Sequence, residues 1–166
     1  RVVRAFKRPQ QHEGVMICEH RLGFISANAA VDESNSQPGT LVTLPEDPDA
    51  SATRLGEALE ARFGVSLGIV VTDTFGRPWR LGQTNVAIGL YRVPATVSNA
   101  GELDAWGRPL SVTEPALADE LAAASGLVVG KASKTPLVLF RGVRWNPVRH
   151  ASARDILRSR EEDMFT

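Results

Sequence analysis

The chain of 166 residues has very little cysteine and no excess charge of either sign. Its single cysteine, Cys18, cannot form a disulfide within the chain, so a reducing compartment such as the cytoplasm is the expected setting. Cys18 lies in an apolar run, which favours a buried side chain over a nucleophile. The 19 basic residues balance 19 acidic residues, and this balance argues against a nucleic-acid or anionic-membrane partner. One basic cluster, interpreted as a flexible terminus, consists of Arg1, Arg4, Lys7 and Arg8.

Long apolar runs and the common phosphate-binding signatures are also absent. No stretch approaches the ~20 apolar residues that a transmembrane helix needs, and we expect no signal peptide. Neither G-x-G-x-x-G nor G-x-x-x-x-G-K-[ST] occurs, which argues against a doubly wound nucleotide-binding fold and against a P-loop. The chain begins at Arg1 rather than at a methionine, so we expect the natural N-terminus to lie further upstream.

The pattern of apolar residues predicts one α+β domain over residues 1–166. Strands and helices interleave without a regular βαβ rhythm, so we expect a mixed sheet with packed helices. Strands are predicted at 15–18, 22–27, 67–71, 86–90 and 136–140, and helices at 51–63, at 114–129 and from Ser152 onward. Asp49 or Ser51 is expected to cap the first helix and Gly64 to end it. Thr113 is expected to cap the second helix, which Gly130 ends.

Two loops place oxygen-bearing side chains directly after apolar strands. Asp73 and Thr74 follow one such strand, and Asp32 and Asn35 follow an earlier one. Magnesium and manganese prefer a few oxygen ligands, usually one or two carboxylates together with water and substrate phosphates. The two loops therefore suggest a site for a metal-bound phosphate.

Arginines beside the second loop suit the same chemistry. Arg77 and Arg80 can hold a phosphate or a carboxylate through forked hydrogen bonds. The alternative is that both aspartates only close Asx-turns after strands, which is the more common role at such positions. Spacing alone does not exclude it. The three histidines have no partner at the spacing of zinc ligands, and no Ser-His-Asp arrangement is recognisable.

Several unusual motifs carry a further resemblance. In chain order they are GFISANAAVDESN, LPEDPDASA, VTDTFGRPWRLGQTNVAIG, GELDAWGRPL, VTEPALADELAAASGLVVGKA and PLVLFRG. From about residue 14 to 142 the chain closely resembles the coenzyme F420-0:L-glutamate ligase family. The resemblance implies a family-specific fold, an intertwined homodimer, and a ligase of coenzyme F420 biosynthesis that joins L-glutamate to F420-0 by a γ-glutamyl amide. It also implies GTP as co-substrate, Mg²⁺ or Mn²⁺, and K⁺.

The resemblance also assigns roles to particular residues. It implies that Asp32 binds a divalent cation, that Asn35 contacts the nucleotide, and that Asp73 and Thr74 hold the metals. Asp73 and Arg77 are the expected catalytic residues. The loop expected to wrap the guanine nucleotide contains Val129, Gly130, Lys131, Ala132 and Ser133. The reaction then proceeds through an acyl phosphate of F420-0, which the amine of glutamate attacks.

The sequence departs from the family pattern in several places. The family has a further N-terminal segment with a Ser-Lys element that contacts the nucleotide. Lys131 stands where some members have an acidic metal ligand, Tyr91 and Arg92 stand where Ala-Gly is usual, and Asn85 replaces a common aspartate. Two alternatives therefore stay open: a non-catalytic, dimerising remnant that binds metal or nucleotide, and an amide ligase for another acid.

Overall fold

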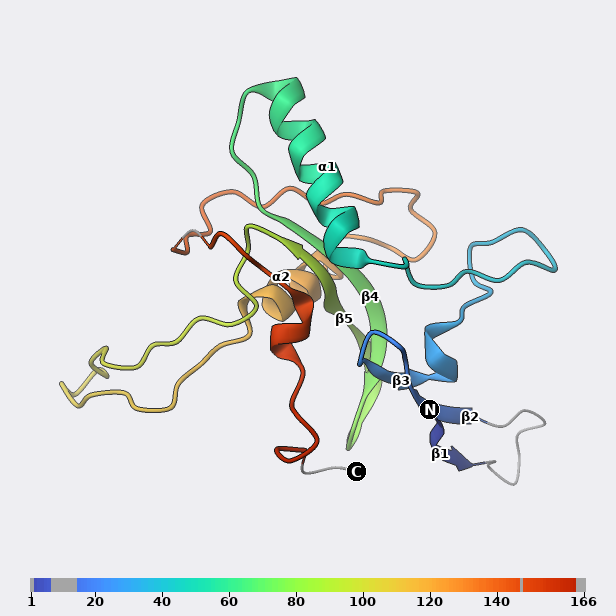
Figure 1. Cartoon of the computed structure of the whole chain (residues 1–166), viewed down its shortest axis with the longest axis horizontal. Helices are drawn as coiled ribbons and strands as arrows, with labels where there is room; N and C mark the ends of the chain where they lie inside the picture. The colour runs from blue at the N-terminus through green and yellow to red at the C-terminus, as the bar shows by residue number, and fades with distance from the viewer. Residues whose placement is uncertain (1, 7–14, 147, 164–166) are drawn as a thin grey trace. The chain divides into compact units, whose positions relative to one another are not determined.

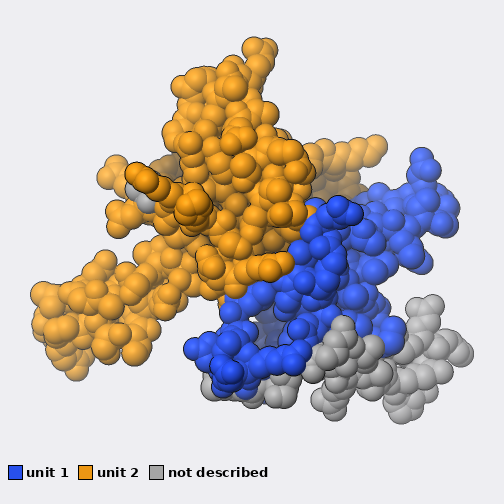
Figure 2. Space-filling view, viewed as in Figure 1, with its two compact units in different colours: residues 1–46, 74–84, 157–166 blue, residues 47–73, 85–156 orange. Residues whose placement is uncertain are grey.

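The computed structural model describes residues 2–6, 15–146 and 148–163, which form two compact units (Figure 2). Unit 1 contains residues 1–46, 74–84 and 157–166, and unit 2 contains residues 47–73 and 85–156. Five strands, two α-helices and two short 3₁₀ turns are found in the described residues (Figure 1). The architecture is α+β, as predicted, but each sheet consists of antiparallel strands rather than forming one mixed sheet.

Unit 1 is built on a three-stranded antiparallel sheet. Strand β2 (Val15–Glu19) pairs with β1 (Val2–Phe6) on one side and with β3 (Ile25–Ala27) on the other. The break expected between the strands predicted at 15–18 and 22–27 is a tight bend, in which His20 donates its backbone N–H to the carbonyl of Phe24 at 2.8 Å. This bend shortens the strand expected at 22–27.

A small core of buried side chains packs with this sheet. Cys18, Leu22 and Phe24 are buried, which confirms the interpretation of Cys18 as a core residue.

The expectation of a flexible basic terminus is wrong for Arg4. This residue lies in β1 opposite Ile17, so it belongs to a paired strand. Arg1, Lys7 and Arg8 lie outside the described residues.

Helix α1 (Pro48–Phe63) opens unit 2. Its N-cap is Asp47, whose carboxylate accepts the backbone N–H of Ala50 at 2.9 Å, and proline at the first position suits a helix start. Asp49 and Ser51 were therefore the wrong cap candidates. Gly64 ends the helix in the left-handed conformation with φ of 63°, as predicted.

Asp49 has a different role, which fixes α1 against the rest of unit 2. One carboxylate oxygen accepts the backbone N–H of Leu90 at 2.8 Å, and the other accepts the hydroxyl of Ser152 at 2.7 Å. The same region contains a close approach of two backbones, because Gly89 packs directly on Pro48. The last helix predicted from Ser152 is only a 3₁₀ turn, η2 (Ala153–Ile156).

Helix α2 (Leu117–Ser125) is shorter than the predicted 114–129. Ala118 and Ala122 are buried and pack it into the core of unit 2. Thr113 does not cap it, because the N-cap is Ala116, without a side-chain hydrogen bond. The helix stops at Gly126, and Val128 beyond it is 72% exposed.

A β-hairpin connects the two units in the chain. It consists of β4 (Ile69–Arg77) and β5 (Arg80–Tyr91), joined by the turn Pro78–Trp79. Both strands are longer than predicted, and Asp73 and Thr74 lie within β4 rather than in a loop after it. The second half of β5, with Ala87, Ile88 and Leu90, is buried in unit 2.

The rest of unit 2 is largely irregular. Residues 97–115 form a paired backbone arm, in which Asn99 donates to the carbonyl of Thr113 at 2.9 Å (Figure 1). The strand predicted at 136–140 is not present, and Leu137 and Leu139 are 64% and 67% exposed. Within the described residues, no helix combines the length and apolar character that a bilayer crossing requires.

Candidate functional site

Asp32 and Asn35 lie in a turn-rich segment of unit 1. The backbone of Asp32 forms a bridge with Val42, with N–O distances of 3.0 and 2.8 Å. Its carboxylate accepts both the backbone N–H of Ser34, at 2.9 Å, and the hydroxyl of Ser34. This is the Asx-turn that the sequence left as the alternative, and it also presents an exposed carboxylate at a fixed position. Asn35 is exposed, with φ of 58°.

The backbone just before Asp32 is strained. Asn28, Ala29 and Ala30 form the turn η1 with φ of 51°, 55° and 56°. For residues other than glycine, this left-handed conformation costs about 1–2 kcal/mol each. Such strain is found mainly where the surrounding structure holds a functional segment in place. The observation therefore marks the Asp32 segment as a site candidate independently of its carboxylate.

Asp73 and Thr74 are consecutive residues of β4, which constrains how they can act together. Asp73 is half-buried and Thr74 is exposed. Side chains of adjacent strand residues leave on opposite faces. A cation held by the Asp73 carboxylate is thus better placed for the main-chain carbonyl of Thr74 than for its hydroxyl. Arg77 ends β4, and its Nη2 donates to the carbonyl of Leu81 at 3.4 Å within unit 1.

The expected nucleotide loop follows α2 in unit 2 as an exposed turn. Ser133 donates its backbone N–H to the carbonyl of Gly130 at 3.0 Å, and Lys131 and Ala132 lie between them at the surface. Val129, which precedes the turn, is half-buried.

An apolar groove of about 690 Å³ links this loop to β4 within unit 2. Val129 lines it, and so does Thr72, the residue directly before Asp73. Asn85 lines it as well and donates to the hydroxyl of Ser125 at 3.2 Å. The structure therefore brings the loop and the strand of Asp73 to one groove. The expected residues Asp32, Asn35, Thr74 and Arg77 belong to unit 1, and Asp73 with Val129–Ser133 belongs to unit 2.

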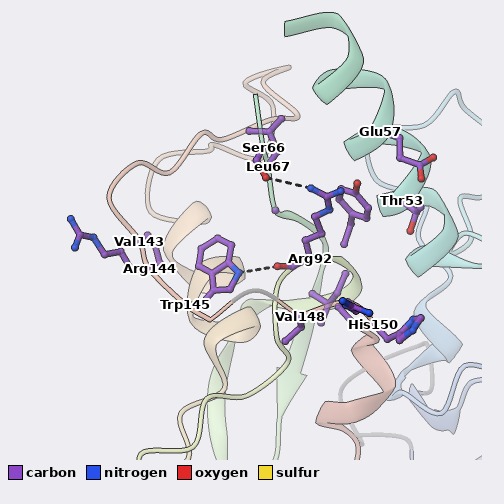
Figure 3. A pocket seen from close by; sticks show the side chains of 15 residues that line it. Thr53, Glu57, Ser66, Leu67, Arg92, Val143, Arg144, Trp145, Val148 and His150 are labelled. Carbon is purple, nitrogen blue, oxygen red and sulfur yellow. Dashed lines mark hydrogen bonds between the residues drawn. The ribbon is translucent and has the colours of Figure 1, made fainter. Parts of the chain in front are cut away.

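A second cavity in unit 2, of about 1130 Å³, was not predicted from the sequence (Figure 3). We call it the arginine cavity. Its walls come from α1, from residues 66–68 just before β4, from the C-terminal end of β5 with Arg92, and from residues 143–145 and 148–151. Its polar and aromatic lining includes Thr53, Glu57, Ser66, Tyr91, Arg92, Arg144, Trp145, Arg149 and His150. The only sequence signal was the unusual pair Tyr91 and Arg92.

A carboxylate beside the arginine cavity organises this pair. Glu60 accepts the backbone N–H of Leu67 at 2.9 Å, the hydroxyl of Tyr91 at 3.0 Å and the guanidinium of Arg92 at 3.0 Å. The Leu67 N–H contributes most to holding the pKa of Glu60 below its ordinary value, and Tyr91 and Arg92 act in the same direction. Burial and the hydrogen bond to Glu60 raise the pKa of Tyr91. Glu60 therefore stays ionised and fixes both side chains.

Comparisons with known proteins relate the chain to one family. A model of the F420-0:Gamma-glutamyl ligase family matches residues 2–142, a range that contains every candidate residue from Asp32 to Ser133. The chain is 46% identical over 154 residues to the coenzyme F420:L-glutamate ligase of Methanopyrus kandleri, and 41% identical over 152 residues to the protein of that name from Methanothermobacter thermautotrophicus. Each comparison covers 90% of this chain but only 61% and 60% of the relatives, so the chain spans about three-fifths of their length. On this match the chain belongs to the F420-0:gamma-glutamyl ligase family.

Proposed function

We propose that this protein is a ligase of coenzyme F420 biosynthesis that joins L-glutamate to F420-0 by a γ-glutamyl amide bond. The observation that carries the proposal is the family match over residues 2–142, a range that includes both carboxylate segments and the loop after α2. Relatives at 46% and 41% identity bear the name coenzyme F420:L-glutamate ligase. GTP is the proposed co-substrate and the cytoplasm the proposed location.

The donor groups suit a hard divalent cation, Mg²⁺ or Mn²⁺. In the described parts of the chain, no three or more His, Cys, Asp or Glu residues are grouped so as to hold a metal. The proposed ligands are instead Asp32, Asp73 and an oxygen of Thr74, with water and phosphate oxygens completing the shell, as is usual for Mg²⁺. A bound cation would neutralise charge on the transferring phosphate. A bound K⁺ is part of the same proposal.

The remaining residues hold and orient the substrates. Asn35 and the turn Val129–Ser133 would contact GTP, with the apolar groove beside Val129 available to the base. The guanidinium of Arg77 would bind a phosphate through forked hydrogen bonds. The terminal carboxylate of F420-0 attacks the γ-phosphate and releases GDP. The amine of glutamate then attacks the acyl phosphate, forms the amide, and releases phosphate and a proton.

A homodimer is part of the proposal because unit 2 presents large apolar side chains to solvent. Leu137 and Leu139 are exposed where the sequence predicts a strand, and Trp106 on the 97–115 arm is 84% exposed. Exposed apolar residues that lie close together, as Leu137 and Leu139 do within one segment, commonly mark protein interfaces. A second copy of the chain would cover these residues and supply a partner for the 136–140 segment. Light scattering coupled to size exclusion tests this, and a monomer at micromolar concentration would contradict it.

The Asp73→Asn variant tests the proposed site most sharply. The full-length gene product is incubated with F420-0, GTP, Mn²⁺ and L-glutamate, and release of GDP is followed. Asparagine keeps the shape of aspartate but loses its charge, so turnover should fall at least about a hundredfold while the circular dichroism spectrum is unchanged. Asp155→Asn, at an exposed carboxylate of η2, is the matched control and should retain turnover.

The outcomes separate the proposal from its alternatives. Unchanged turnover in Asp73→Asn would remove Asp73 from the metal site. GTP binding without GDP release, in the presence of all substrates, would instead indicate a non-catalytic binding protein. GDP release with another acid but not with F420-0 would indicate a different amide ligase.

A further inference from the structure

Arg92 holds a main-chain conformation that arginine rarely adopts. Its φ is 57°, in the left-handed region that glycine occupies without strain. Three contacts keep it there: its carbonyl accepts the indole N–H of Trp145 at 2.8 Å, its Nη1 lies 3.0 Å from Glu60, and its guanidinium lies 5.1 Å from the ring centroid of Tyr91. A strained residue that neighbours fix in this way is a candidate for function.

The fixed guanidinium lies in the wall of the arginine cavity. Figure 3 shows Arg92 between the side chains of α1 and the indole of Trp145. Its hydrogen bonds to Glu60 and to the hydroxyl of Ser66 both use Nη1. Within the described residues, Nε and Nη2 are therefore left for a ligand. Arginine presents these N–H groups in a rigid fork that matches carboxylate and phosphate oxygens.

The cavity concentrates positive charge in a chain whose net charge is zero. Its lining contains three arginines and a histidine but one carboxylate, Glu57, and a second carboxylate, Glu60, is paired with Arg92 beside the cavity. Figure 3 shows Arg144 pointing away from the other lining side chains. Arg149 and His150 form no hydrogen bond or ion pair with any other residue that the structure describes, so an incoming anion meets no competing protein partner there.

We propose that the arginine cavity binds a small anion that carries phosphate or carboxylate groups. Arg92 provides the fixed fork, Arg149 a second charge, and Trp145 the wall that keeps Arg92 in place. None of the residues proposed to bind metal or nucleotide lines this cavity, although it shares Ser66, Leu67, Gly68, Val143 and Trp145 with the apolar groove. Anion binding here is therefore an addition to the proposed metal–phosphate site and not part of it.

Titration calorimetry with two probe anions tests this proposal. Inorganic pyrophosphate represents phosphate ligands, citrate represents carboxylate ligands, and sorbitol is the neutral control. The protein is passed over a chelating resin beforehand to remove divalent cations, so that the Asp73 site does not contribute and no soluble chelator competes for the cavity. We expect saturable binding of at least one anion and none of sorbitol, and the tighter anion identifies the ligand chemistry. Absence of saturable binding for both anions would overturn the proposal.

Variants then place the binding in this cavity. Arg92→Gly relieves the positive φ and removes the fork, so affinity should fall at least about tenfold while the unfolding temperature changes little. Arg149→Gln, at an exposed residue that has no partner among the residues the structure describes, should weaken binding similarly. Arg154→Gln, at an exposed arginine outside the lining, and Asp73→Asn should bind as the unaltered protein does. Unchanged affinity in both Arg92→Gly and Arg149→Gln, or an equal loss in Arg154→Gln, would contradict the proposal.

Discussion

The contact between Gly56 and Tyr91 predicts that Gly56→Ala destabilises the protein when the tyrosine ring is present and stabilises it when the ring is removed. Gly56 is buried in the middle of α1, where alanine would normally stabilise a helix by about 1 kcal/mol. A β-carbon at this position, however, would overlap Cδ1 and Cε1 of the Tyr91 ring. Adding a methyl group to a packed site costs about 1–3 kcal/mol. Gly56→Ala should therefore destabilise the protein by a net amount of about 1 kcal/mol.

The effect should reverse once the ring is removed. In the Tyr91→Ala background the overlap is gone and only helix propensity remains, so Gly56→Ala should stabilise by about 0.5–1 kcal/mol. The coupling energy between the two positions is then about 1–3 kcal/mol, which is the packing cost itself.

Urea denaturation of the four proteins in this cycle measures the free energies of unfolding. Ala58→Gly, at an exposed position of the same helix, provides the propensity contribution alone and should cost about 1 kcal/mol. The reasoning is refuted if Gly56→Ala has the same effect with and without the Tyr91 ring, because the ring would then not occupy the space beside the helix.

Three further substitutions test the packing and electrostatics of unit 2. The pKa of Glu60 is held below its ordinary value of 4.5, mainly by a backbone hydrogen bond, so its contribution to stability is present above that value and lost as the pH falls through the folded pKa. Glu60→Gln should therefore lose less stability between about pH 5 and pH 3 in urea titrations, and an unchanged slope would contradict this. Partial burial raises the pKa of Asp119, so its contribution is present below its ordinary pKa and lost as the pH rises through the folded value. Asp119→Asn keeps an acceptor for the Ala87 N–H. This variant should be at least as stable as the unaltered protein at neutral pH and lose this advantage in acid. A lower stability of the variant at neutral pH would refute the burial argument. A β-carbon on Gly89 would overlap the backbone of Pro48, so Gly89→Ala should destabilise by about 1–3 kcal/mol in thermal unfolding, and an unaffected midpoint would show that the two backbones separate easily.

Short sequence patterns predicted the structural features that depend on interactions between residues close together in the chain. Gly64 marked the end of α1 because the left-handed conformation there favours glycine. The apolar run around Cys18 predicted a strand, and Cys18 within it is buried. Asp32 and Asp73 were singled out by their place after apolar strands, and the Asx-turn of Asp32 was one of the two roles expected for it.

The hairpin was missed because its turn carries an unusual residue. Gly76 and Pro78 made the whole segment resemble a loop, yet β4 continues through Gly76 to Arg77. The turn needs a left-handed residue at Trp79, with φ of 57°, a position where glycine or asparagine is the usual signal. A tryptophan there gives no sequence indication of a turn.

Long-range packing decided the other differences. At Gly126, where α2 ends, a β-carbon would lie 3.2 Å from both the carbonyl oxygen of Ala123 and Nδ2 of Asn85, so the packing there favours glycine. Residues 136–140 have the composition of a strand but find no neighbouring strand in the described part of the chain. The arginine cavity combines segments as distant as Thr53 and Ala151, so no local pattern could reveal it.

The central claim is the transfer of glutamate to F420-0, and mass spectrometry of the reaction tests it directly. The full-length gene product is incubated with F420-0, GTP, Mn²⁺ and L-glutamate, and the deazaflavin products and GDP are quantified together. We expect F420-0 to gain a glutamyl residue with one GDP formed for each amide bond. Recovery of F420-0 unchanged, in a preparation that remains folded by circular dichroism, would contradict the account.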